Sequence, residues 1–180
     1  MTLWRTLRDA LVGWQRLLLG RPGWRECFTL SAPGLVAALG LYLVVALLAI
    51  SVSSAGYGLP TLAALLGGLF VLSLPVLALC LAVFGTRSII GREGSPYDLL
   101  VPGIYLAAAF VIIEGALVLL GGPVVMLSWL ALAFGYFRLA RGAAGWNSGI
   151  SASFGVLAVV LLVAMRVALY ILSNPPGSPI

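Results

Sequence analysis

The sequence predicts an all-α protein that crosses a membrane several times, and three observations support this prediction. Hydrophobic residues make up 62% of the 180-residue chain and charged residues only 8%, against about 25% charged residues in a soluble domain. Five long apolar stretches follow a more polar N-terminal segment, and each approaches the ~20 residues that cross a bilayer. Arginines occur in alternate loops between these stretches. We therefore expect a cytoplasmic amphipathic segment (residues 1–30), a domain of five transmembrane helices (31–173) and a short external tail (174–180).

The first twenty residues, MTLWRTLRDALVGWQRLLLG, have the pattern of a helix that lies in the lipid headgroup layer. Apolar residues recur at spacings of three and four, which places them on one helix face. That face holds Trp4, Leu7, Leu11, Trp14 and Leu18, with Arg5, Arg8 and Arg16 to one side. We expect the rings to face lipid and the arginines to bind anionic headgroups; packing against a partner is the alternative. No unbroken apolar core precedes a cleavage site, so we do not expect a signal peptide.

The five apolar stretches predict transmembrane helices that differ in length, the fourth being short. The predicted spans are Pro33–Ser53, Pro60–Phe84, Val101–Leu120, Pro123–Leu139 and Ala152–Leu172. Prolines at or near the starts of four spans suit the first helical turn, where the missing N–H costs little. Pro75 lies inside the second span, so we expect a kink there.

The arginines predict the orientation of the chain. Nine of the ten arginines flank the spans: Arg5, Arg8, Arg16, Arg21 and Arg25 in the N-terminal segment, Arg87 and Arg92 after the second span, and Arg138 and Arg141 after the fourth. The other two loops and the tail have none. By the positive-inside rule, the N-terminus is cytoplasmic and the C-terminus lies outside. We expect a multi-pass protein of a bacterial inner membrane.

The tenth arginine, Arg166, and one glutamate, Glu114, lie inside predicted spans. A charge at this depth costs a few kcal/mol and usually has a partner. The third and fifth spans run in the same direction, and both residues lie ~14 residues, or ~20 Å, from the inner edge. We predict an ion pair that fixes the register of these two spans. Two alternatives remain: a polar point on an ion, proton or substrate path, or Arg166 snorkelling outward while Glu114 is protonated or faces a partner subunit.

Small residues in the second span predict a close helix contact. Ala63 and Gly67, and Ala64 and Gly68, have the four-residue spacing that lets two helices approach closely. We expect this contact inside the bundle, with a homodimer interface as the alternative.

The sequence gives no support to catalysis or cofactor binding. It contains no histidine, which removes the usual metal and haem ligands and the commonest general base. The two cysteines, Cys27 and Cys80, are far apart, and no serine of a span has a candidate base. We expect no enzyme activity, no cofactor and no metal. Nucleic-acid binding is not expected either, because no soluble domain remains to perform it.

Several loop features resemble those of a known family. RPGW (21–24) precedes the first span, the turn-rich GREGSPYDLLVPGIYLAAAF (91–110) leads into the third, GGP (121–123) precedes the fourth, and YFRLARGAAGWNSGISASFGVL (136–157) leads into the fifth. This layout resembles the bacterial branch of the Yip family of five-span membrane proteins. DLLVP (98–102) echoes that family's DLYGP motif, with Leu and Val in place of Tyr and Gly and at a different location.

The resemblance implies a non-enzymatic helical bundle that binds partners and organises membranes, with no active-site residues to transfer. We therefore expect a scaffold or accessory subunit whose partners are lipid, other membrane proteins or copies of itself. The alternative is a small oligomeric carrier or channel that uses Glu114 and Arg166.

Overall fold

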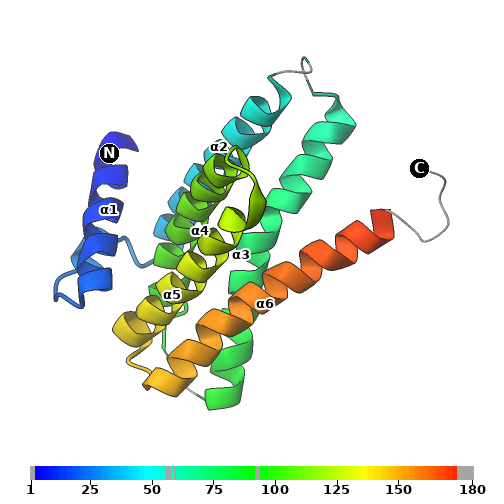
Figure 1. The fold of residues 1–180 in the computed structure, drawn as a ribbon. Helices are drawn as coiled ribbons and strands as arrows, with labels where there is room; N and C mark the ends of the chain where they lie inside the picture. The colour runs from blue at the N-terminus through cyan, green and yellow to red at the C-terminus, as the bar shows by residue number, and fades with distance from the viewer. Residues whose placement is uncertain (1–2, 56–57, 59, 92–93, 174–180) are drawn as a thin grey trace.

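The chain folds into a bundle of α-helices. A computed structural model describes residues 3–55, 58, 60–91 and 94–173, is 86% helical and contains no strand in these ranges (Figure 1). The helices are α1 (Leu3–Leu19), α2 (Ala32–Ser54), α3 (Leu62–Ile90), α4 (Tyr97–Val118), α5 (Val125–Ala144) and α6 (Ser148–Ser173), with short 3₁₀ helices η1 (Arg25–Cys27) and η2 (Gly122–Val124). The predicted fold class is confirmed.

Five of the helices in the described ranges are long and apolar enough to cross a membrane. They are α2, α3, α4, α6 and the continuous segment Gly122–Ala144, which joins η2 to α5, with mean hydropathies from 1.5 to 2.7. The sequence placed the centres of these spans well but set several ends too early. α3 continues to Ile90 and α5 to Ala144, and each ends at a glycine with positive φ, Gly91 or Gly145. A polar helix end that leaves the hydrocarbon layer has no hydropathy signal, so such ends were missed.

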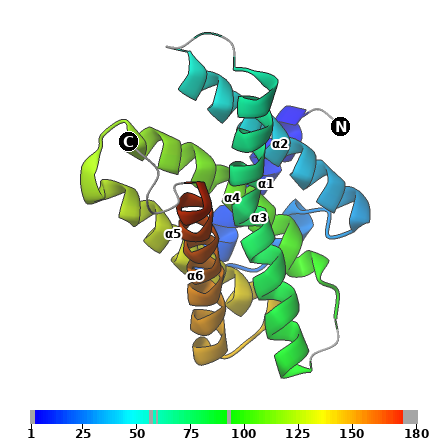
Figure 2. The ribbon, with the colours of Figure 1, turned by 90° about the vertical axis from the view of Figure 1, so that its right-hand side faces the viewer.

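The helices do not pack in their sequence order. α2 packs mainly on α4 and makes little contact with α3, whereas α3 packs on α6 and α4, and α5 lies between α4 and α6. Figure 1 shows α3 and α6 close together near the end of α3 and the start of α6, and diverging toward their other ends, while Figure 2 shows the two helices side by side. The change occurs at Pro75, inside α3. The buried residues of α3 lie between Leu74 and Val83, whereas none of residues 62–70 is buried.

The amphipathic helix α1 packs against the bundle, which corrects part of the sequence-based interpretation. Trp14 was expected to face lipid, but its ring is buried and its Nε1–H donates to the carbonyl of Pro102 in α4, at 3.0 Å. Arg16, which is half-buried, donates to the carbonyl of Gly23 at 3.0 Å; its expected contact with headgroups stays a prediction. Leu11, from the same predicted face, is exposed. A membrane protein's own helices offer the same apolar surface as lipid, so the pattern alone did not separate them.

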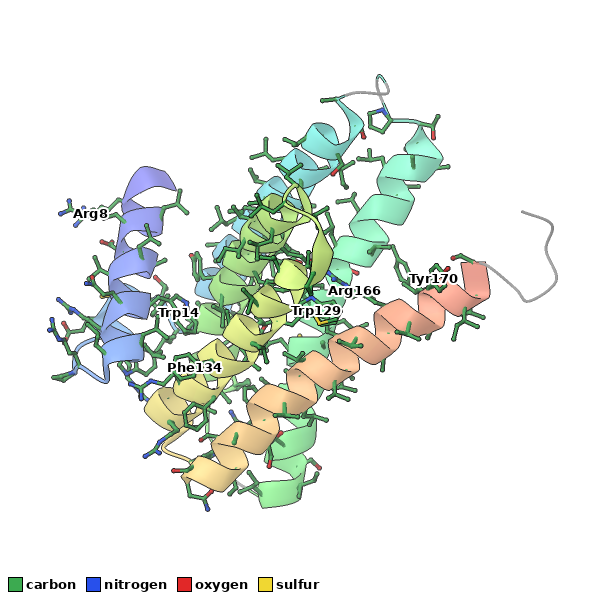
Figure 3. The ribbon with its side chains drawn as sticks, in the orientation of Figure 1. Arg8, Trp14, Trp129, Phe134, Arg166 and Tyr170 are labelled. Carbon is green, nitrogen blue, oxygen red and sulfur yellow. The ribbon has the colours of Figure 1, made fainter. Side chains whose placement is uncertain are left out.

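The remaining predicted anchors are consistent with an exposed outer face of α1. Arg5 is exposed, and Arg8 is exposed and points away from the bundle in Figure 3. The side chain of Trp4 lies outside the described part of the structure.

The small residues predicted in α3 do not make the expected contact. Ala63, Ala64 and Gly67 are exposed, and of the two glycines only Gly68 has a close neighbour, the side chain of Ile50. The close contact forms instead along α2, where every fourth residue is buried: Gly34, Ala38, Tyr42, Ala46 and Ile50. Gly34, Ala38 and Ala46 of this stripe are small residues that permit close packing, and they were not among the small residues predicted to do so.

The two ends of the bundle differ in charge. The end that carries η1, the start of α4 and the end of α5 holds most of the described arginines, namely Arg16, Arg25, Arg87, Arg138 and Arg141; we call it the arginine-rich end. Arg5 lies farther along the bundle, beside Leu41 and Val44 of α2. There, Arg25 pairs with Asp98 at 3.0 Å and donates to the carbonyl of Ala143. Arg138 donates to the carbonyl of Leu17, so these arginines cap the exposed carbonyls at two helix ends. The opposite end, where α2 ends and α3 begins, is the arginine-free end.

Candidate functional site

Glu114 of α4 and Arg166 of α6 form an ion pair inside the bundle. Arg166 donates through both terminal nitrogens, with Nη1 to Oε1 at 2.5 Å and Nη2 to Oε2 at 2.8 Å. The side chains of Arg166 and Glu114 are only 22% and 12% exposed. Two parallel, charge-assisted hydrogen bonds are the strongest arrangement available to this pair. They join α4 to α6, although these two helices do not pack directly on each other.

Trp129 of α5 completes this group of side chains. Its indole Nε1–H donates to Oε1 of Glu114 at 2.8 Å, so the carboxylate accepts bonds from two further helices. Figure 3 shows Trp129 and Arg166 meeting near the centre of the bundle. We call Glu114, Trp129 and Arg166 the polar triad.

The sequence contained a signal for Trp129 that the analysis missed. Glu114 lies seven residues before Gly121 and Trp129 lies seven residues after Gly122. In two antiparallel helices joined by a tight turn, residues at equal distances from the turn lie at the same level. Gly121 and Gly122 both have positive φ, which permits that turn.

The polar triad lies at the base of an open cavity at the arginine-free end. Residues from all five membrane-spanning helices line this cavity, which has a volume of about 810 Å³; we call it the funnel. Its wall includes Ser53 and Ser54 near the end of α2, Gly67 of α3 and Gly115 of α4. Tyr170 of α6 also lines it and is exposed, and Figure 3 shows it near the end of that helix.

A second polar contact lies beside the funnel wall. The hydroxyl of Tyr42 donates to the carbonyl of Leu72, in the turn of α3 that precedes Pro75. Proline lacks the N–H that continues a helix and displaces carbonyls of the preceding turn. A side-chain donor from a neighbouring helix therefore stabilises α3 where its own hydrogen bonding is interrupted.

The site contains no group of side chains suited to a metal. No cluster of three or more cysteine, aspartate or glutamate side chains occurs within the described ranges of the chain. What the triad and funnel offer is a fixed set of hydrogen-bond donors at the bottom of a mostly apolar wall, which is the usual composition of a ligand-binding site.

Comparisons with protein-family models, with curated proteins and with solved structures found no match. The class of protein therefore follows from the fold: five apolar helices identify an integral membrane protein with several spans.

Proposed function

We propose that this chain is a non-enzymatic scaffold or accessory subunit of a bacterial inner-membrane complex, with its arginine-rich end in the cytoplasm. The observation that most supports this role is the apolar surface left on α2 and α6. Their mean hydropathies are 2.7 and 2.5, yet only 17% of each spanning window is buried. Lipid or the helices of other membrane proteins must cover these faces.

The polar triad agrees with a structural role. Glu114 receives three hydrogen bonds from α5 and α6, so its charge is neutralised within the chain and fixes three helices together. The resemblance to the Yip family implies the same kind of non-enzymatic role.

The test is site-specific photo-crosslinking in native membranes, followed by mass determination of the solubilised complex. A photoreactive residue replaces Val36 or Leu48 on α2, or Val160 or Val167 on α6, all exposed. The buried Ile104 of α4 serves as the matched control. We expect one foreign membrane protein to crosslink from an exposed position and to copurify in fixed ratio. Crosslinks to lipid alone, with a homogeneous oligomer of this chain, would contradict the scaffold role.

A carrier or channel is the second candidate, and the funnel favours it. A cavity that reaches an intramembrane charge pair is a common feature of transport pathways. Purified protein in liposomes would show solute or proton flux that Glu114→Gln abolishes. Absence of flux for protons, cations and anions alike would reject this candidate.

A further inference from the structure

The funnel is open on one side, between α3 and α6. None of residues 62–70 of α3 and none of residues 167–173 of α6 is buried. Figure 1 shows these two segments diverging, with no other described helix between them. Because both segments belong to membrane-spanning helices, this opening faces the lipid leaflet at the arginine-free end.

Glycines widen the funnel. A Cβ atom built on Gly67 or Gly115 meets no atom within 4 Å, and both residues line the cavity. A glycine inside a helix destabilises it by about 0.5–1 kcal/mol relative to alanine, so two such glycines beside open space call for an explanation. The space beside these two glycines suits an extended hydrocarbon chain and not a further helix, because a helix with its side chains is about 10–12 Å across.

Arg166 retains donors at the base of the funnel. A guanidinium has five N–H groups, and two of them bond to Glu114. Its Nε has no hydrogen-bond partner within the described chain but is buried, so the donors left for a ligand are the second N–H groups of Nη1 and Nη2. Glu114 already accepts three bonds, so the triad offers more donors than acceptors. The pair of Glu114 and Arg166 has no net charge, so it would not offset the cost of burying a second anion, whereas a neutral acceptor such as a carbonyl oxygen does not carry that cost.

We propose that the funnel binds one glycerolipid from the leaflet at the arginine-free end. An ester carbonyl oxygen of the lipid accepts a hydrogen bond from Arg166, and one acyl chain lies against the wall formed by Gly67 and Gly115. The volume of about 810 Å³ falls within the usual range of ligand sites. The lipid reaches the site sideways from the bilayer, through the opening between α3 and α6. This inference does not depend on the scaffold role.

Native mass spectrometry of the full chain, released from nanodiscs of a phosphatidylethanolamine and phosphatidylglycerol mixture, tests the proposal. We expect one retained lipid per chain, and about tenfold weaker retention in Gly67→Leu and Gly115→Leu, because the added side chain fills the wall. Gly85→Leu is the matched control: Gly85 also has open space around its Cβ, but it does not line the funnel. Equal retention in all four proteins, or none in the unchanged protein, would overturn the proposal.

A second measurement does not use Gly67→Leu or Gly115→Leu, so it does not depend on whether these variants fold. Phospholipid brominated along its acyl chains should quench the fluorescence of Trp129, read as the difference between the unchanged protein and Trp129→Phe. When unbrominated phosphatidylethanolamine is added, the quenching of Trp129 should be lost more slowly than the quenching of the other tryptophans. No quenching of Trp129, or displacement of lipid by a copurifying protein helix, would reject a lipid as the occupant. Lipid retention and protein crosslinking are read separately, so either proposal can fail alone.

Discussion

At the scale of single residues, Glu114 occupies an unfavourable position that its partners correct. It lies four residues before the last residue of α4, Val118, where the helix dipole places partial negative charge. The carboxylate therefore depends on Arg166 and Trp129 for its stability. This explains why three different helices contribute to one side chain.

Glu114→Gln and Arg166→Met should each destabilise the protein by about 3 kcal/mol, because each leaves one charged or polar group buried without its partner. The double variant should lose about 2 kcal/mol less than the sum of the two single losses. Thermal unfolding in a mild detergent measures all three. Strictly additive losses would show that the two residues do not stabilise each other.

Trp129→Phe should cost about 1.5 kcal/mol, the contribution of a hydrogen bond to a charged group. The same substitution in the Glu114→Gln background should cost less, since the acceptor is then neutral. Phe134→Leu, at an exposed aromatic residue of the same helix, is the control. Unfolding free energies of the four proteins decide whether the bond to Glu114 matters.

At the scale of helices, two glycines of α2 have very different surroundings. A Cβ atom added to Gly34 would collide with the backbone carbonyl of Thr29, which cannot move without shifting the start of the helix. Gly40, on the same helix, has open space around it. The two glycines therefore have different roles although the sequence presents them alike.

Gly34→Ala should destabilise the protein by about 2 kcal/mol through overpacking. Gly40→Ala should be neutral or stabilising by up to about 1 kcal/mol, because alanine is the better helix former. Unfolding midpoints measured side by side test this contrast. Similar effects of the two substitutions would mean that α2 starts differently from the described structure.

The same comparison shows what the sequence could and could not predict about helices. Hydropathy located the five spans because the bilayer sets their length. It could not choose between the small residues of α2 and those of α3, since both sets have the same spacing. Which set is buried against another helix depends on how the helices are arranged, because lipid and a neighbouring helix are equally apolar.

At the scale of the whole molecule, charge separates the two ends of the bundle. Arginines of the arginine-rich end also stabilise the fold, as the pair between Arg25 and Asp98 shows. The sequence predicted that Glu114 and Arg166 lie at one depth, because that argument needs only the rise per residue. It could not predict the funnel, since a cavity depends on how helices diverge.

The orientation of the chain is tested by cysteine labelling. In a variant without native cysteines, Thr61→Cys at the arginine-free end should react with a membrane-impermeant maleimide in intact cells. Ser95→Cys at the arginine-rich end should react only after the cells are opened. Both positions are exposed in the structure. The reverse labelling pattern would place the arginine-rich end outside, against the positive-inside rule.

The pairing of α2 with α4 determines how long α2 lacks its main partner helix while the chain is being synthesised. α2 ends at Ser54 and α4 ends at Val118, so the ribosome adds 64 residues, the difference between these two numbers, before the partner of α2 is complete. At about 5–20 residues per second this takes about 3–13 s. During that interval the packing face of α2 lacks its partner helix. Of the later spans only α3 is present, and α2 makes little contact with α3 in the folded protein. We therefore expect the packing of α2 to be completed only after α4 has been inserted.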